Sequence, residues 1–381
     1  RKEEKMLRVF ALCCLLIQMV SALASTSPPP TSNTVPTTYK ALVAKSTGLS
    51  FAQVAEVQTV PTPSITDDEV LVKVIYAGIN GGCETFRARG EYAFKGNAEA
   101  TEPFGLGAEG VGVVAAVGSN VADLNVGDSV CFVGSAFAEY SKCKASTLWK
   151  IPEATPEYVG LRVSGLTACA MLEQTGKLKE GEVVLITAAA GGAGHFAVQF
   201  AKLAGCTVIG TCGSSEKAEV LQTLGCDYII NYKNQDVAKE IKKIAPNGLD
   251  AVLEGVGGSM LQIALDNLSP EGRLLQVGYI SEYPHNTQAK DESAKNELNA
   301  SELFWKSQTI TRGKQTIYGN AWPKDYGSVA GSSDRVLKLF AEGKLKSLID
   351  DKEKFVGLDS VTDAIDHMLS GKTIGKVIVK I

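Results

Sequence analysis

Histidine is scarce in this chain of 381 residues, which has only three: His195, His285 and His367. None of them stands at a ligand spacing from a cysteine or a carboxylate, and the nine cysteines include no C-x-x-C pair. Tetrahedral zinc sites need such closely spaced donors, so the sequence argues against a metal site and against a disulfide framework. We interpret the cysteines beyond the N-terminal segment as small buried residues.

Positive charge is not concentrated anywhere. The chain has 38 Lys and Arg against 42 Asp and Glu, a formal net charge of -4, and no basic block. A protein without such a block cannot neutralise a row of phosphates, so we expect no nucleic-acid partner. Beyond residue 24 there is also no apolar run of the length that a bilayer requires, so we expect no membrane span in the mature chain.

The N-terminal segment has the composition of a secretory signal. An apolar run over residues 9–20 follows Arg8, and Ala22-Leu23-Ala24 offers small residues for cleavage, which predicts a signal peptide over residues 1–24. An uncleaved membrane anchor is the alternative. Residues 25–38, rich in Pro, Ser and Thr, are interpreted as a linker. We expect the chain to reach the ER lumen or an organelle supplied through the ER, and secretion is the less expected address.

The rest of the sequence changes pattern near residue 164. Residues 39–163 contain short apolar runs broken by Gly and Pro, such as EVLVKVIYAGIN and GVGVVAAVG, which predicts a barrel-like all-β unit. From residue 164 strands alternate with helices, which predicts a doubly wound parallel sheet. The predicted strands are residues 183–187, 207–211, 228–231, 251–254 and 274–277, and the predicted helices are residues 165–174, 192–203, 216–224, 236–244, 259–268 and 360–369.

A glycine-rich turn joins the first of these strands to a helix. The stretch VVLITAAAGGAGHFAVQF is an A-x-x-G-x-x-G form of the dinucleotide fingerprint. Small residues let the backbone turn sharply and approach a pyrophosphate, whose charge is stabilised at the helix N-terminus. We therefore predict that this turn binds a dinucleotide through Ala188, Gly191, Gly192, Ala193 and Gly194.

The end of the second strand indicates which dinucleotide is bound. NAD-binding folds place an acid there for the ribose 2′-hydroxyl. This chain reads TCGSSEK, with no acid between residues 211 and 215 and with Ser214, Ser215 and Lys217 at hand. Hydroxyls, backbone amides and a cation suit a 2′-phosphate, so the predicted cofactor is NADPH.

These motifs resemble the medium-chain dehydrogenase/reductase superfamily, in its zinc-free quinone oxidoreductase branch. FGLGAEGVGVVAAVGSNVADLNVGDSV is similar to the N-terminal signature and TAAAGGAGHFAVQFAK to the cofactor signature. The resemblance implies an α/β chain with a GroES-like β-barrel domain and a doubly wound Rossmann domain with a parallel sheet. The implied boundaries are 39–163 for the first part of the catalytic domain, 164–307 for the NADPH-binding domain and 308–381 for the return to the catalytic domain. We also expect a homodimer that acts on a small-molecule substrate.

The resemblance assigns further residues to the cofactor. It implies that Ala193 lies under the pyrophosphate and that Gly213 and Lys217 lie at the 2′-phosphate. Tyr232 is implied to lie at the adenosine end, although it could instead be a strand residue of the core. The nicotinamide side is implied to be lined by Gly255, Val277 and Tyr283.

The resemblance also bears on the reaction. Zinc-dependent members have a G-H-E ligand sequence where this chain has Gly107-Ala108-Glu109, and alanine cannot bind metal. An enone can be reduced without a metal, because hydride adds at the β-carbon while charge moves to the carbonyl oxygen. The implied activity is NADPH-dependent reduction of the C=C bond of α,β-unsaturated carbonyl compounds of enone, alkenal or 15-keto-prostaglandin type. The catalytic candidates are Asn80 and Tyr92.

Several alternatives stay open at this stage. Asn80 could cap a turn and Tyr92 could be a loop aromatic. The same site could reduce quinones or enoyl-thioesters, and a non-catalytic dinucleotide-binding protein is an alternative of another class. Other charged residues are interpreted as surface charges (Arg87, Arg89) or as barrel and turn structure (Glu109, Asp128).

Overall fold

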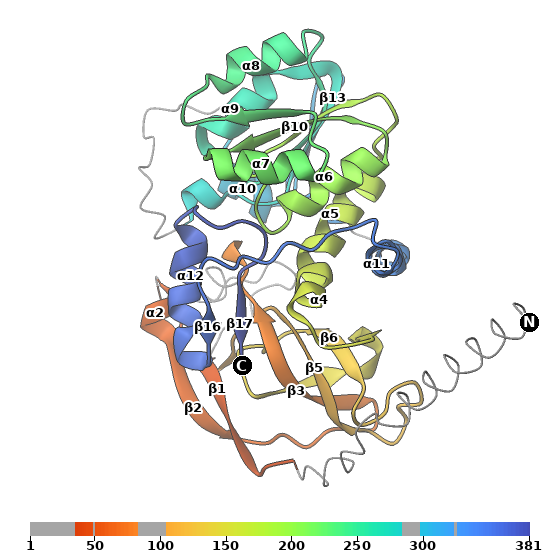
Figure 1. The fold of residues 1–381 in the computed structure, drawn as a ribbon, viewed down its shortest axis with the longest axis vertical. Coiled ribbons are helices and arrows are strands. Elements are labelled where there is room, and N and C mark those ends of the chain that lie inside the picture. Colours follow the sequence, from red (N-terminus) through yellow and green to blue (C-terminus); the bar gives the residue numbers. More distant parts are fainter. Residues whose placement is uncertain (1–34, 49, 83–103, 284–297, 324–325) are drawn as a thin grey trace, which may run out of the picture. The chain divides into compact units, whose positions relative to one another are not determined.

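The computed structural model describes residues 35–48, 50–82, 104–283, 298–323 and 326–381. Contacts between residues divide the chain into two units, Arg1–Pro36 and Thr37–Ile381, and the fold below is that of the second unit. Its elements run from β1 to β17 (Figure 1). In the described part of the chain, no helix combines the length and apolar character needed to cross a membrane.

The first domain is built of mostly antiparallel strands. One sheet has the order β16-β17-β3-β5-β6-β8 with β7 paired to β3, and a smaller sheet has the order β2-β1-β4. Alternate residues of β3, among them Val70 and Val72, enter a core that also holds Phe132 and Phe137. The strands are β1 (Thr38–Ala44), β2 (Ala55–Pro61), β3 (Glu69–Gly78), β4 (Phe104–Gly105), β5 (Glu109–Val117), β6 (Ser129–Val133), β7 (Tyr140–Lys144), β8 (Trp149–Ile151), β16 (Phe355–Val356) and β17 (Ile378–Lys380).

The second domain is a sheet of seven strands in the order β11-β10-β9-β12-β13-β15-β14. All neighbours are parallel except β14 and β15. Val184 and Ile186 of β9 pack on one face and Leu185 on the other, which is why this strand is an unbroken apolar run. The elements are β9 (Val183–Ile186), α6 (Gly194–Leu203), β10 (Thr207–Cys212), α7 (Ser215–Thr223), β11 (Tyr228–Asn231), α8 (Val237–Ile244), β12 (Leu249–Glu254), α9 (Gly258–Asp266), β13 (Leu268–Gln276), α10 (Ala300–Trp305), β14 (Thr309–Arg312) and β15 (Gln315–Tyr318).

The second sheet extends beyond the boundary predicted at residue 307. Strands β14 and β15 form a hairpin, and β15 pairs with β13 through Arg273 and Thr316, Leu274 and Ile317, and Leu275 and Tyr318. The second sheet therefore ends at residue 318 and not at residue 307, and the next strand of the first domain, β16, begins at residue 355. Periodicity could not place this boundary, because a two-stranded hairpin extends either kind of sheet equally well.

A long helical stretch connects the two sheets. It begins with α4 (Pro156–Gly160), earlier than the predicted start at residue 165, and continues as α5 (Leu166–Ala170). π-helical turns Leu161–Gly165 and Met171–Thr175 follow α4 and α5. A π-helical turn widens the helix and shifts its hydrogen bonds, and such turns are frequent at functional sites.

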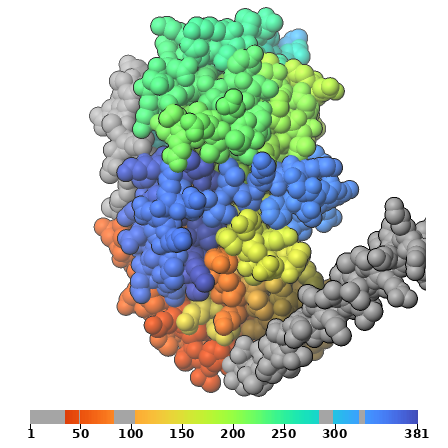
Figure 2. All heavy atoms as spheres, viewed as in Figure 1, coloured from red at the N-terminus to blue at the C-terminus, as the bar shows by residue number. Residues whose placement is uncertain are grey.

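The C-terminal segment contacts both domains. After α11 (Tyr326–Ala341), the amide of Gly375 donates to the carbonyl of Ala190 at 2.8 Å, and the amide of Ile79 donates to the carbonyl of Val377 at 3.0 Å. Helix α12 (Val361–Leu369) packs on β16 and β17. Figure 2 shows this segment in blue, beside the green residues of the second domain and the orange residues of the first.

The cysteines that the structure describes are buried, as predicted, and Cys83 lies outside the described residues. Those that the structure describes are unpaired thiols: Cys131, Cys143, Cys169, Cys206, Cys212 and Cys226.

Candidate functional site

A cavity of about 710 Å³ brings together most of the residues that the sequence selected. Its wall includes parts of the glycine-rich turn, the carboxyl ends of β10 and β12, the chain after β3, the π-helical stretch and the C-terminal segment. Of the predicted cofactor residues, those in the wall are Ala188, Gly191, Gly192, Ala193, Gly194, Gly213, Lys217, Tyr232, Gly255, Val277 and Tyr283. Ser214 and Ser215 are absent from the wall, and the catalytic candidate Asn80 is part of it.

The glycine-rich turn is tight because two of its positions allow little side chain. Ala188 has a φ of 46°, in the left-handed region, and its carbonyl accepts the amide of Gly191 at 2.9 Å. A Cβ at Gly194 would lie 2.3 Å from the same carbonyl oxygen, so a larger residue would displace the backbone. The turn therefore opens α6 directly at the cavity, where the first amides of the helix have no intrahelical acceptor.

The residues around the N-terminus of α7 have defined roles. Ser214 is the N-cap of α7, and its hydroxyl oxygen accepts the amide of Lys217 at 3.2 Å. The Lys217 ammonium donates to the carbonyl of Gly371 at 2.6 Å, and burial lowers the pKa of Lys217. The hydroxyl of Thr211, at the end of β10, is buried and has no hydrogen-bond partner in the part of the chain that the structure describes. A ligand group that carries polar oxygens could accept hydrogen bonds from the Thr211 hydroxyl and from the Lys217 ammonium.

Tyr232 lies at the surface end of the cavity. It follows β11, is 42% exposed and lines the cavity wall, so the alternative that it belongs to the core is wrong. A Cβ at Gly213 would lie 2.5 Å from the Tyr232 hydroxyl. A side chain at residue 213 would therefore require the Tyr232 ring to move.

A buried carboxyl orders the loop at the other end. Glu254, the last residue of β12, accepts the amides of Val256 at 2.7 Å and Gly257 at 3.1 Å. Burial raises the pKa of Glu254 to about 7. The hydroxyl of Thr187 accepts the amide of Gly255 at 2.9 Å, so Gly255 is held against the cavity from two sides.

Another part of the wall is apolar. Tyr283 is buried and stacks edge-on against Tyr279, with ring centroids 4.9 Å apart. The large apolar side chains of the wall include Ile79, Met171, Tyr283, Phe304, Trp322 and Met368. Such a lining suits a hydrocarbon portion of a ligand and excludes water from polar groups beside it.

Asn80 is held by hydrogen bonds in the cavity wall. Its Nδ2 donates to Glu109 Oε1 at 2.8 Å, and its Oδ1 accepts from the ammonium of Lys376 at 2.8 Å. Glu109 is fully buried and forms an ion pair with Lys376. The interpretation of Glu109 as barrel structure is thus incomplete, because its carboxylate also holds a cavity residue in place. The second candidate, Tyr92, lies outside the described residues, as do Arg87 and Arg89.

Sequence reasoning missed Lys376 and Ser164, which both line the cavity. The signal for Lys376 was a charged residue inside the apolar final strand sequence GKVIVKI, next to a glycine. Ser164 gave no comparable signal. Asp128 does serve as turn structure, as predicted: it accepts the amide of Asn125 at 2.8 Å and pairs with Lys150.

The histidines that the structure describes have structural partners. His195 is fully buried in α6, its Nε2 accepts the amide of Leu348 at 3.1 Å, and its Nδ1 donates to the carbonyl of Gly191 at 2.9 Å. Burial lowers the pKa of His195 to about 4, which keeps the ring neutral. Within the described ranges, no three His, Cys, Asp or Glu side chains are grouped so that they could hold a metal ion.

Comparison with known families gives two matches. Residues 66–153 match the alcohol dehydrogenase GroES-like domain, and residues 192–328 match the zinc-binding dehydrogenase domain. The two matched segments fall in the first and the second domain of the structure.

Comparison with individual proteins extends over nearly the whole chain. Prostaglandin reductase-3 of Mus musculus is 38% identical over 355 residues, which cover 91% of this chain and 90% of that protein. A probable quinone oxidoreductase of Leishmania amazonensis is 36% identical over 349 residues, covering 91% and 99%. Among solved structures, the CurK enoyl reductase superposes with a TM-score of 0.72 at 26% identity, covering 91% of this chain and 99% of that one.

Proposed function

The chain belongs to the medium-chain dehydrogenase/reductase superfamily, in its quinone oxidoreductase branch, and is an oxidoreductase with a nicotinamide cofactor; we propose that it uses NADPH to reduce the C=C bond of α,β-unsaturated carbonyl compounds. One observation carries the proposal: a single cavity joins the dinucleotide turn to an apolar wall that also contains Asn80. The resemblance to prostaglandin reductase-3 makes large apolar enones, such as 15-keto-prostaglandins, the substrates to test first.

The residues present fit the cofactor. The first amides of α6 would hold the pyrophosphate, and Lys217 with the N-terminus of α7 would hold a 2′-phosphate. The buried hydroxyl of Thr211, which has no partner among the described residues, supports the binding of a polar group there, and residues 211–215 contain no acid. When bound, a reduced nicotinamide dinucleotide supplies hydride.

The protein's own residues would do the rest of the work. The loop at Gly255, ordered by Glu254, would position the reacting ring against Val277 and Tyr283. The apolar wall would bind the hydrocarbon part of the enone and exclude water. A donor in the wall would stabilise the negative charge that develops on the carbonyl oxygen, and an acid would deliver a proton to the α-carbon.

A substrate screen tests this proposal. Purified protein is mixed with NADPH and, separately, with enones, quinones and enoyl-thioesters, and NADPH oxidation is followed by absorbance. We expect the highest kcat/KM on an enone, with the saturated ketone as product. A higher kcat/KM on quinones or thioesters would reassign the substrate, and cofactor binding without oxidation of any compound would support the non-catalytic alternative.

A further inference from the structure

A buried polar cluster lies where four distant segments meet at the cavity: Asn80, Glu109, Ser164 and Lys376. Glu109 begins β5 and is fully buried. Its carboxylate accepts from Asn80 Nδ2 and from the amide of Val163, each at 2.8 Å, and it pairs with Lys376. Val163 lies in the first π-helical turn. The carboxylate therefore satisfies one amide of this turn and one cavity side chain at the same time.

The ammonium of Lys376 is nearly removed from solvent. The residue is 2% exposed, and its Nζ donates to Asn80 Oδ1 at 2.8 Å, contacts Ser164 Oγ at 3.5 Å and pairs with Glu109. A Cβ at Gly192 would lie 3.7 Å from Cδ of Lys376 and 3.3 Å from Ser164 Oγ, so the cluster lies directly beside the dinucleotide turn. A buried charge is costly unless it is paired, and here the ammonium has three polar partners, of which Ser164 at 3.5 Å is the weakest.

The ion pair determines how Asn80 is oriented. Its amide oxygen faces the cation and its nitrogen faces the carboxylate, so the amide cannot turn over without losing both contacts. Nδ2 also lies 3.5 Å from the carbonyl oxygen of Gly78, which is a long and weak hydrogen bond for its second hydrogen. Ser164 accepts from the same cation, which leaves its own hydrogen to donate elsewhere. Both side chains line the cavity.

We propose that Lys376 is a positioning residue that makes Asn80 and Ser164 a donor pair for a substrate oxyanion. This inference rests on the proposed enone reduction. In that reaction the β-carbon gains a hydride from the reduced nicotinamide, the electrons of the C=C bond move toward the carbonyl oxygen, and the α-carbon then gains a proton from an acid. Negative charge on the oxygen is stabilised by the two donors and by the positive potential of the ammonium behind them.

Three variants separate this role from simple stabilisation of the fold. Lys376→Met and Glu109→Gln each leave one partner of a buried pair, so both should unfold at lower urea concentration than the wild type. The double variant removes both charges and should regain most of that loss. Its kcat on the best enone should nevertheless stay about 100-fold below the wild-type value, since donors of this kind are typically worth about that much. Its Kd for NADPH should change little.

A matched control is Lys380→Met, which removes an exposed lysine from the same strand segment and should keep wild-type kinetics. A double variant with restored stability and wild-type kcat would overturn the proposal and leave the pair as a link between segments. If kcat fell only by the same factor by which the Kd for NADPH rose, the loss would be one of cofactor binding, and the proposal would be overturned as well.

A second readout does not depend on turnover. 4-Nitrophenol has different absorbance as phenol and as phenolate, so titrating it into the NADP⁺-loaded protein reports which form is bound. We expect the wild type to bind the phenolate and the double variant to lose that preference. If the wild type binds the phenolate but reduces no enone, the proposed function is refuted. The donor pair formed by Asn80 and Ser164 is then still supported. A wild type that binds only the phenol, or neither form, would contradict the donor pair itself.

Discussion

At the scale of a single residue, we propose that Lys217 determines the choice between NADPH and NADH. Its ammonium donates to the Gly371 carbonyl and would exchange that neutral acceptor for a 2′-phosphate. Replacing Lys217 with alanine should raise the KM for NADPH far more than the KM for NADH. A charge-assisted contact contributes roughly 1.5–3 kcal/mol, which corresponds to a change of about ten- to a hundred-fold. Steady-state kinetics with both cofactors measures it.

The control for this change is Lys242→Ala, which removes an exposed lysine from α8, away from the cavity wall. It should leave both KM values as they are. Equal increases for NADPH and NADH in the Lys217 variant would show that the residue does not recognise a 2′-phosphate.

Tyr92 remains a prediction from the family resemblance. A phenol with a pKa near 10 stays protonated at neutral pH and can donate to an oxyanion or to the α-carbon. Tyr92→Phe should lower kcat by about 100-fold to 10,000-fold if Tyr92 is the sole acid, and by less if another donor shares the task. Binding of NADPH should hardly change. Unaltered kcat under conditions where hydride transfer limits the rate would exclude an acid role.

Glu254 should make stability depend on pH. Burial raises its pKa from 4.5 to about 7, so the folded state keeps a proton that the unfolded state has lost. The contribution of this group is complete below pH 4.5 and is lost as pH rises to about 7. Relative to Glu254→Gln, which stays neutral, the wild type should lose up to about 3 kcal/mol of unfolding free energy over this range. Urea unfolding at several pH values measures the difference, and a constant difference would mean that the pKa of Glu254 is the same in the folded and the unfolded state.

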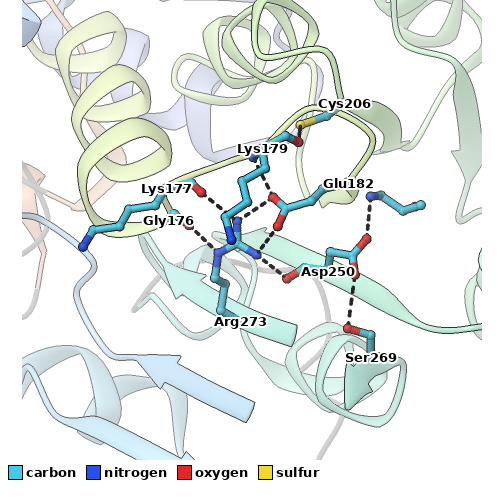
Figure 3. A network of polar contacts seen from close by, with 9 residues as sticks. Gly176, Lys177, Lys179, Glu182, Cys206, Asp250, Ser269 and Arg273 are labelled. Atoms are coloured by element: carbon cyan, nitrogen blue, oxygen red, sulfur yellow. Dashed lines mark hydrogen bonds and ion pairs between the residues drawn. The ribbon is translucent and has the colours of Figure 1, made fainter. Parts of the chain in front are cut away.

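At the scale of elements, Arg273 of β13 joins three pieces of the second domain (Figure 3). Its guanidinium binds both carboxylate oxygens of Glu182, at 3.0 and 2.6 Å, and the carbonyl of Asp250 at 2.8 Å. It also donates to the carbonyls of Gly176 and Lys177, which end the long helical stretch. The network thus fixes the end of that stretch against the start of β9 and β12.

Removing this arginine should destabilise the second domain. Arg273→Met breaks a bidentate pair whose side chains are only 16% and 17% exposed. We expect a loss of about 1–3 kcal/mol of unfolding free energy, measured by urea denaturation. The control is Lys314→Met, which breaks the exposed pair with Glu271 and should cause no measurable loss. Similar midpoints for the two variants would show that the network adds nothing beyond surface pairing.

At the scale of the whole molecule, the prediction concerns the compartment to which the N-terminal segment sends the chain. Residues 1–34 lie outside the described residues, and we propose that residues 1–24 direct the chain into the secretory route and are cleaved after Ala24. A fusion of residues 1–38 to a fluorescent protein should enter the ER and be shortened at that position. Deleting residues 9–20 from the fusion is the matched control and should leave it in the cytosol. A diffuse cytosolic signal from the intact fusion would refute the proposal.

Local pattern by itself determined much of this protein. The apolar run before the glycine-rich turn, the alternation of strands and helices from residue 164, and the missing acid near Thr211 all act over a few neighbouring residues. They are therefore visible in the sequence, and they were sufficient to predict both domains and the glycine-rich turn. The predicted strand over 228–231 coincides with β11, because one short apolar run is bounded clearly on both sides.

Only the tertiary structure decided which distant residues meet. The hairpin of β14 and β15 joined the second sheet, Tyr232 proved to cover Gly213, and Lys376 met Glu109, Asn80 and Ser164 at the cavity. Periodicity says which face of an element is buried, but it does not say what lies across from that face. A lysine in a final strand reads as a surface charge until folding places a buried carboxylate against it, because burial and pairing are properties of the packed chain and not of its local order.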